Sequence, residues 1–471
     1  MPSNSQIPGA AQWRSSASGY SGDPNLQGRT PNIDRLAHKG LNFANAVSVC
    51  PVCTPYRASL MSGQYPTTNG IFLNDLSLSP ETECIGDVFK AGGYATGYIG
   101  KWHIDGQGRG AYIPPERRQG FDYWKAMECN HNYQAGKASY YEGTNPQRKV
   151  WDKYEPYAQT EDAIQYLQDH AKEEKPFCLF LSFGTPHNPH ETAPQGIKNS
   201  FDAEKLVFSP NVPQSVLKKA EEYKDAPESD RKNLYAQMIG YYSHIVALDQ
   251  CIGQIMTALE SFDLIQNTIV VLTSDHGESL GSHGGYVGKK QVVWDESSHV
   301  PLLIHYPANH TTEGRILETP VTTPDITVSL LNLCGLSVPS TMEGADLSGM
   351  IKGGSEPKHK VALFMQLSPF GGCYDTPEYR AIRDRKYVYA ENLDGPWILF
   401  DMKNDPYQLN NLIDNKEYKS VATQLRKRLK SELDSIGDEL RPRDYYTNQW
   451  GYKVNKRGIY IPEKNKNHKF N

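Results

Sequence analysis

Apolar strands alternate with helices through the first three quarters of the chain, and this alternation constrains the fold more than any other feature. Residues 177–183 and 268–273 are short runs rich in aromatic and β-branched side chains, which are typical of buried strands. Between them, residues 233–260 carry apolar side chains at helical spacing. This order predicts an α/β fold with a mostly parallel central sheet covered by helices on both faces.

A second, smaller unit follows this region. The composition changes near residues 351–354, Ile-Lys-Gly-Gly. Beyond that point come four short strand-like runs joined by turns and then a helix, over residues 358–366, 379–383, 386–390, 396–400 and 417–436. We therefore expect a catalytic domain over residues 1–355 and a small C-terminal α+β subdomain, an antiparallel sheet with one helix, over residues 356–471.

Charge and apolar pattern argue against several kinds of partner. A formal net charge of −5 argues against a nucleic-acid partner. No apolar run reaches the length of a membrane-spanning helix, so we expect no membrane span. The first eleven residues lack the charged and apolar regions of a secretory signal. The compartment stays open: cytoplasmic for the sequence as written, periplasmic or secreted if a native N-terminus was removed.

Cys53 opens the stretch Cys-Thr-Pro-Tyr-Arg, which predicts the start of a helix. Thr54 is a suitable N-cap, Pro55 suits the first helical position, and Gly63 can end the helix. Cys53 would then lie at a helix N-terminus, where N–H groups and the helix dipole favour an anion. Arg57 would follow one turn later. We interpret this stretch as a binding site for an anionic group that undergoes nucleophilic attack.

Two other interpretations of this stretch exist. One is a buried structural cysteine at a helix start. The other is a redox pair, since Cys50 and Cys53 have the C-x-x-C spacing. No βαβ unit of the thioredoxin kind surrounds them, which argues against the redox pair.

Further reactive side chains follow predicted strands. Ligands of open α/β sheets bind beyond the carboxyl ends of the strands, so we expect these side chains at one site. Asp275 and His276 supply one carboxylate and one imidazole, the beginning of a metal site, although such a pair alone also fits a capped turn. The other candidates are Lys101 and His103 after residues 94–99, His187 after residues 177–183, and Lys290.

These segments resemble, in order, the motifs of the type I sulfatases of the alkaline phosphatase-like superfamily. Residues 53–57 resemble the sulfatase signature Cys-x-Pro-x-Arg. The other matching motifs are Gly-Lys-Trp-His at 100–103, Pro-His-Asn-Pro at 186–189, Ser-Asp-His-Gly-Glu at 274–278 and Asp-Pro at 405–406. The resemblance extends from about Gln12 to about Leu412.

The resemblance implies an alkaline-phosphatase-like fold and hydrolysis of a sulfate ester. In that family a maturation enzyme, the formylglycine-generating enzyme, converts the signature cysteine to formylglycine. Cys53 would therefore carry the hydrated aldehyde that acts as nucleophile, and the maturation enzyme would be a partner. A sulfated carbohydrate is the expected substrate, because such substrates are common in the family and because residues 104–144 form an insertion rich in aromatic side chains.

The resemblance also assigns roles to the other candidates. Arg57 and Lys101 would hold the nucleophile and its charge. His187 and Lys290 would bind sulfate oxygens, and one of them would protonate the leaving alcohol. His103 would help to expel sulfate and regenerate the aldehyde. Fixed cations of this kind suit the transfer of an oxyanion.

A divalent metal, calcium, is implied at Asp275 and His276. In the family a buried strand ending in two metal-binding aspartates precedes the segment that matches residues 12–14. Here residues 6–11, Gln-Ile-Pro-Gly-Ala-Ala, have neither a strand-like run nor a carboxylate. We therefore expect the N-terminal metal-ligand strand to be missing or altered, and the metal to bind poorly, because calcium sites use six or more oxygens.

Two alternatives to a working sulfatase follow. The first is a phosphonate monoester or phosphodiester hydrolase, which shares the fold, the nucleophile and the Asp-His metal pair. The second is a catalytically impaired relative that binds a ligand, an interpretation favoured by the missing aspartates, because metal loss removes a main source of charge stabilisation.

Overall fold

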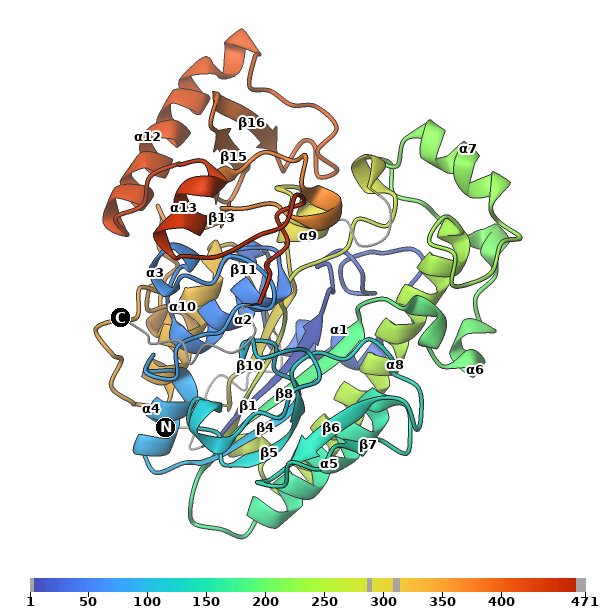
Figure 1. Ribbon diagram of the computed structural model, residues 1–471, viewed down its shortest axis with the longest axis vertical. Helices are drawn as coiled ribbons and strands as arrows, with labels where there is room; N and C mark the ends of the chain where they lie inside the picture. The colour runs from blue at the N-terminus through green and yellow to red at the C-terminus, as the bar shows by residue number, and fades with distance from the viewer. Residues whose placement is uncertain (1–3, 286–289, 308–313, 463–471) are drawn as a thin grey trace.

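A ten-stranded mixed sheet forms the centre of the computed structural model, which describes residues 4–285, 290–307 and 314–462 (Figure 1). Five neighbouring strands at its middle are parallel. In spatial order they are β9 (Thr268–Ser274), β1 (Asn4–Ala11), β8 (Phe177–Pro186), β4 (Ala95–Lys101) and β5 (Tyr123–Met127). Because they are parallel, their carboxyl ends lie along one edge of the sheet.

Shorter strands extend the sheet on both sides. Beyond β9 lie β10 (Leu302–His305), β2 (Leu41–Phe43) and β11 (Arg315–Leu317), and beyond β5 lie β6 (Ser139–Glu142) and β7 (Lys149–Val150). A separate two-stranded ladder pairs β3 (Ala46–Val47) with β12 (Val321–Thr322).

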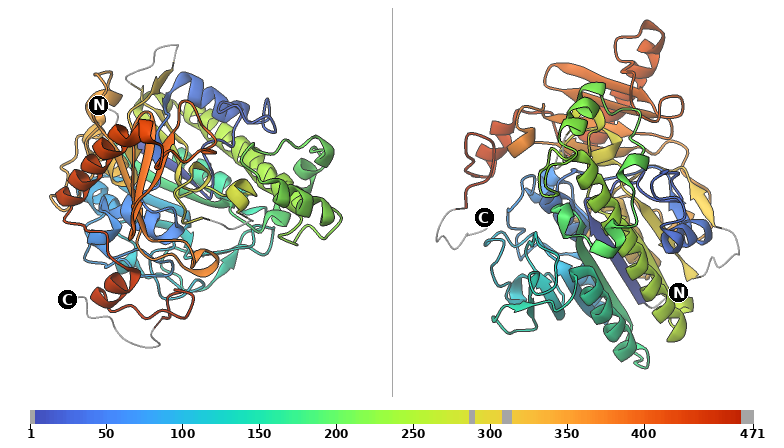
Figure 2. Two further views of the ribbon diagram at one scale, coloured as in Figure 1. Left: turned by 90° about the horizontal axis from the view of Figure 1, so that it is seen from above. Right: turned by 90° about the vertical axis from the view of Figure 1, so that its right-hand side faces the viewer.

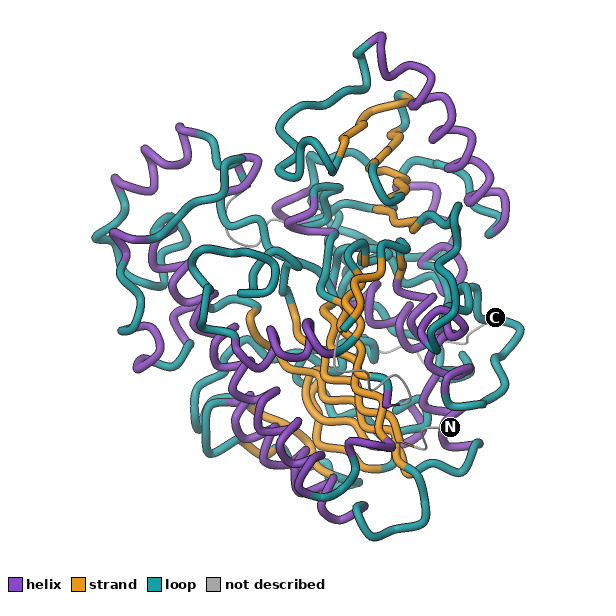
Figure 3. Tube along the Cα trace, turned by 180° about the vertical axis from the view of Figure 1, so that it is seen from behind, coloured by secondary structure: helices purple, strands orange, loops and turns teal. Residues whose placement is uncertain are grey.

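Helices cover both faces of the sheet. Figures 2 and 3 show the strands in the middle of the molecule with helices on either side. Alternate side chains of β9 enter two different apolar cores: Ile269 and Val271 one, Val270 and Leu272 the other. The first core includes α2 (Cys53–Ser62), α4 (Ile85–Ala91) and α10 (Thr323–Leu333), and the second includes α1 (Pro31–Lys39), α5 (Glu155–His170) and α8 (Leu234–Ser261). The prediction of a mostly parallel sheet between helices is confirmed.

Strand β1 contradicts one expectation. The sequence predicts no strand over residues 6–11, yet this segment lies in the middle of the sheet, between β8 and β9. Pro8 and Gly9 disfavour a strand, but parallel ladders on both sides determine the backbone conformation. The expectation of a missing strand is therefore wrong. The absence of carboxylates stands, because β1 ends in Ala10 and Ala11.

The insertion at residues 104–144 contains regular secondary structure. It contains β5 and β6, and both belong to the main sheet. The parallel ladder of β5 on β4 pairs Lys101 with Met127. Just beyond it, Trp102 N–H donates to the Met127 carbonyl over 2.8 Å. The insertion thus brings its own residues to the edge where β4 ends.

A small antiparallel sheet with one long helix forms the C-terminal part, at the top of Figure 1. Its strands, in order, are β13 (Ala362–Gln366), β14 (Tyr379–Arg383), β15 (Tyr387–Asn392) and β16 (Gly395–Asp401), followed by α12 (Lys419–Ser435) and α13 (Arg443–Gln449). This architecture is the one the sequence predicts. The division of the chain between residues 355 and 356 stays a prediction.

The remaining α-helices are short. They are α3 (Pro66–Asn69), α6 (Gln195–Lys198), α7 (Gln214–Glu222), α9 (Asp295–Ser298) and α11 (Ser348–Ile351). Within the three described stretches of the chain, no helix combines the length and the apolar character needed to cross a bilayer.

Candidate active site

The predicted site residues meet at the edge where the parallel strands end. Lys101 is the last residue of β4, and His103 follows two residues later. His187 comes directly after β8, and Asp275 and His276 come directly after β9. The strands are neighbours, so residues separated by more than 170 positions in sequence lie side by side, and the N-terminus of α2 lies beside them.

Helix α2 begins two residues earlier than the sequence predicts, at Cys53 instead of Pro55. Cys53 is its first residue, Val52 precedes it in extended conformation, and no side chain caps it. Thr54 is therefore not the N-cap; instead its Oγ1 accepts from Asp75 N–H over 3.3 Å. Gly63 ends the helix in the left-handed region, as expected, with φ 64°. Cys53 thus lies in the first turn, where N–H groups lack helical acceptors.

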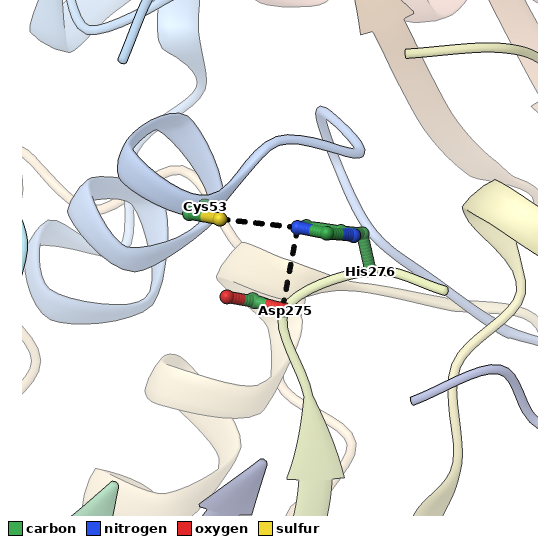
Figure 4. Close-up of side chains that lie close together, drawn as sticks. All are labelled: Cys53, Asp275 and His276. Atoms are coloured by element: carbon green, nitrogen blue, oxygen red, sulfur yellow. Dashed lines mark hydrogen bonds and ion pairs between the residues drawn. The ribbon is translucent and has the colours of Figure 1, made fainter. Parts of the chain in front are cut away.

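Cys53 is 1% exposed and faces two nitrogens. Its Sγ lies 3.2 Å from Nε2 of His276 (Figure 4). The same Sγ lies 3.4 Å from Nζ of Lys290. Burial alone would raise the pKa of the Cys53 thiol, but Lys101, Lys290 and His276 together hold that pKa well below its usual value. Position 53 is therefore surrounded by positive charge, which favours an anion there.

Arg57 is held away from solvent by three acceptors. It donates to Oδ2 of Asp275 over 3.1 Å, to the Lys101 carbonyl over 2.8 Å and to Oγ of Ser182 over 2.7 Å. These contacts fix the guanidinium between α2, β4, β8 and β9. Nζ of Lys101, by contrast, is buried and has no hydrogen-bond partner among the described residues. Burying an ammonium group without a hydrogen-bond partner costs free energy. Lys101 is therefore available to donate to an oxygen atom of a bound ligand.

His103 is oriented by a residue that the sequence analysis did not identify. Its backbone has φ 61°, and its Nε2 lies 3.0 Å from Oδ1 of Asp75. Burial would lower the pKa of His103, but the nearby Cys129 sulfur and Asp75 raise it well above its usual value. Asp75 is also bound by Arg109, through two bonds of 2.9 Å.

His187 and Lys290 form a pair next to Cys53. Nδ1 of His187 lies 2.6 Å from the carbonyl of Asn188, and because a carbonyl only accepts, Nδ1 carries the proton. Nε2 therefore presents a lone pair, 3.5 Å from Nζ of Lys290. Burial and Lys290 hold the pKa of His187 well below its usual value. The ammonium is thus the proton-bearing member of this pair.

Three side chains can bring donor atoms to one metal ion: Cys53, Asp275 and His276, with ligand atoms within 4.8 Å of one another. Nδ1 of His276 donates to the Gly277 carbonyl over 2.9 Å, so its Nε2 lone pair is available. Asp275 accepts from Gln12 N–H through Oδ1, over 2.8 Å. This set resembles the start of a divalent-cation site, with one carboxylate where the motifs imply three.

Gln12 is a further donor that the sequence analysis did not identify. It directly follows β1, has φ 69°, and is fully buried. Its side-chain amide has no hydrogen-bond partner in the part of the chain that the structure describes. Gln12 contacts Asp275 through its backbone N–H, and an unpaired buried amide oxygen is a ligand that a hard cation such as calcium takes. The residues present therefore fit a divalent cation, with fewer charged ligands than expected.

Pattern reasoning missed Asp75, Gln12 and Cys129 for different reasons. Asp75 is a loop residue outside any motif. Gln12 adjoins the place where the aspartates were sought, so its position was a usable signal. Cys129 is one of eight scattered cysteines. Burial would raise the pKa of its thiol, but His103 and Lys101 hold that pKa well below its usual value.

The chain matches two protein families. Residues 11–336 match the Sulfatase family, and residues 281–435 match the family described as "N-sulphoglucosamine sulphohydrolase, C-terminal". Together these matches cover most of the chain, including every residue of the candidate site.

Individual relatives agree with the family matches. The chain is 45% identical to the ulvan-active sulfatase of Formosa agariphila, over 96% of this chain and 85% of that protein. It is 29% identical to the endo-4-O-sulfatase of Bacteroides thetaiotaomicron, over 89% and 87%. Among solved structures, a protein assigned as sulfatase yidJ from Bacteroides fragilis has a TM-score of 0.79 at 29% identity, covering 94% of this chain and 97% of that one. The chain therefore belongs to the sulfatase family of the alkaline phosphatase-like superfamily and is a sulfuric ester hydrolase.

Proposed function

We propose that this sulfatase hydrolyses the sulfate ester of a carbohydrate, with residue 53 acting as formylglycine and with a divalent cation in the site. The observation that carries this proposal is the surroundings of Cys53: a buried side chain in the first turn of α2, contacted by Lys290 and His276 and influenced by the charge of Lys101. A carbohydrate is favoured because the C-terminal family match names a sulphoglucosamine hydrolase and the 45% identical relative is active on ulvan.

Formylglycine, when present, would supply the hydrated aldehyde that acts as nucleophile, and a cation bound by Asp275 and His276 would supply polarisation of the sulfate. The chain's own residues bind and neutralise the transferring group. The charges of Lys101 and Lys290 both act on position 53, so both ammonium groups can bind sulfate oxygens as negative charge develops on them. Arg57, whose guanidinium donates to Asp275, contributes a further positive charge to the site.

Hydrolysis breaks the bond between sulfur and the ester oxygen, and the leaving oxygen must gain a proton. The proton is held at Nζ of Lys290, beside the lone pair of His187 Nε2. These two groups therefore deliver it to the leaving alcohol. His103, which Cys129 and Asp75 keep protonated, assists the departure of sulfate. Water supplies the remaining oxygen and hydrogen, so the products are the sugar alcohol, sulfate and a proton.

Asp275, His276 and the amide oxygen of Gln12 would hold the cation, and calcium is the expected ion because oxygen donors predominate. The formylglycine-generating enzyme would be the partner that converts Cys53. One observation favours a second function: Ala10 and Ala11 remove two acidic ligands, so a weakly metallated chain would bind sulfated glycans and turn them over slowly.

The test is the mass of the peptide containing residue 53, combined with activity. Formylglycine weighs about 18 mass units less than cysteine. The chain is produced with and without the formylglycine-generating enzyme and assayed on 4-nitrophenyl sulfate and on sulfated oligosaccharides. We expect activity to rise in proportion to the converted fraction and to require a divalent cation. Equal activity of the unconverted protein would overturn the role of formylglycine. Faster turnover of an aryl phosphodiester would overturn the preference for sulfate.

A further inference from the structure

The loop after β5 reaches the candidate site from the insertion. β5 is parallel to β4, so residues 128–132 leave the sheet at the same edge as Lys101 and His103. This loop contains Glu-Cys-Asn-His-Asn. Cys129 is 6% exposed and lies near His103, whereas His131 is exposed. The loop therefore runs from beside the reacting groups outward to solvent.

His131 covers the proton-delivering pair. Its ring is stacked on that of His187, with the centroids 4.7 Å apart and the planes at 10°. Its Nε2 lies 3.4 Å from Sγ of Cys129, which anchors the exposed ring to the buried part of the loop. His187 in turn lies 3.5 Å from Lys290. The exposed imidazole is thus one ring away from the group that protonates the leaving oxygen.

Asn130 supplies an independent sign of a ligand. Its side-chain Nδ2 is buried, yet it has no hydrogen-bond partner among the residues that the structure describes. An amide nitrogen has two hydrogens to donate, and a buried donor without an acceptor is unfavourable. A hydroxyl or ring oxygen of a substrate placed against the loop would satisfy it.

We propose that residues 129–131 form the binding subsite for the sugar ring that carries the leaving oxygen, with Asn130 donating to a sugar oxygen and His131 packing on the ring. The sulfate is then bound by the cations at the strand ends, and the sugar by this loop. The proposal rests on the carbohydrate sulfatase function proposed above and adds the residues that select the leaving group. An aryl sulfate, whose leaving group lacks sugar hydroxyls, would use the loop much less.

The experiment compares substrates with and without a sugar. The converted, metal-loaded enzyme and its variants His131→Ala and Asn130→Ala are assayed on 4-nitrophenyl sulfate and on a panel of sulfated oligosaccharides that includes ulvan; the best sugar substrate is carried forward. We expect each variant to lower kcat/KM for the sugar about tenfold or more, mainly through KM, because one hydrogen bond or ring contact is lost. For 4-nitrophenyl sulfate we expect less than about a threefold change.

Two further variants separate binding from support of His187. His131→Phe keeps a ring for stacking and loses the imidazole nitrogens, so it should retain part of the sugar kcat/KM. His170→Ala removes another histidine that is stacked on an aromatic ring, Tyr166, at 4.0 Å on α5, and should leave both substrates unaffected.

Each outcome is decisive. Equal losses on both substrates would overturn the subsite and assign His131 only a supporting role toward His187. Unchanged sugar kinetics would overturn it as well, as would a wild-type enzyme that hydrolyses 4-nitrophenyl sulfate but none of the sugars. A wild-type enzyme inactive on every sulfate ester would instead contradict the proposed function.

Discussion

The two halves of the candidate site differ in how completely they match the motifs. The cationic half is complete: it consists of Lys101, His103 and Lys290, with the neutral imidazole of His187 beside Lys290. The carboxylate half is depleted: Asp275 remains, but β1 ends in two alanines. The backbone of β1 is nevertheless in place, bonded on both sides.

This difference shows that a strand's place in a sheet and its chemistry are separable. The ladders of β1 depend on backbone groups, which alanine supplies as well as aspartate. The ligands depend on side chains, which alanine lacks. A fold can therefore remain intact while a metal site loses charge, and substitutions can test each half separately.

Cys53→Ala should have the largest effect because it removes the proposed nucleophile, which both halves of the site serve. We expect kcat/KM for any sulfate ester to fall by at least about 10⁴-fold. Thermal unfolding followed by circular dichroism checks that the variant is folded, since a buried side chain is changed. Residual activity above about one per cent in a folded variant would contradict the role of residue 53.

Lys290→Ala tests the cationic half. Loss of the ammonium removes both a ligand for sulfate oxygens and the proton beside His187, so kcat should fall about 10²- to 10³-fold. Substrates with poor leaving alcohols should lose more than 4-nitrophenyl sulfate, which needs less protonation. Lys290→Arg is the matched control: it keeps the charge and should restore binding better than turnover. Equal losses for good and poor leaving groups would argue against proton delivery.

Ala10→Asp combined with Ala11→Asp tests the depleted half. Two added carboxylates raise the charge and the number of ligands, so the affinity for calcium should rise about 10- to 100-fold in a calorimetric titration. Activity at limiting calcium should rise with it, at unchanged formylglycine content. If neither metal uptake nor activity improves, the interpretation as an impaired, ligand-binding relative gains support.

Asp75→Asn should have the smallest effect and sharpens the cationic half. Burial lowers the pKa of His103, whereas Cys129 and Asp75 raise it, so the imidazolium is present at low pH and is lost as pH rises through the raised value. Removing the Asp75 charge lowers that pKa, so the alkaline limb of kcat/KM should move to lower pH, by about one unit.

Arg109→Ala is the companion variant. It removes the other partner of Asp75, but the guanidinium is 47% exposed and screened by solvent, so its shift should be smaller. If the alkaline limb of the kcat/KM profile lies at the same pH in Asp75→Asn and in the wild type, the limb does not report the titration of His103.

Much of the fold could be predicted from the sequence because the signals were local. The β-branched run at residues 268–273 was sufficient to predict β9, and the parallel arrangement then placed Asp275 and His276 at the edge. β1 could not be predicted, because Pro8 and Gly9 have low strand propensity and only its two neighbours determine its conformation. Asp75 could not be predicted as a partner of His103, because the two residues meet through a loop with positive φ.

The position of β1 also affects how the protein is made. The side chain of Asn4 accepts a hydrogen bond from the backbone N–H of Phe177, 173 residues later in the chain. The backbone N–H of Trp13, just after β1, donates to Ser274, 261 residues later. At synthesis rates of about 5–20 residues per second, the segment leaves the ribosome roughly 13–50 s before its second partner exists. During that interval β1 has no β9 to pair with, so one strand edge and its apolar side chains stay exposed. Nascent chains of this sulfatase should therefore depend on chaperones until β9 emerges.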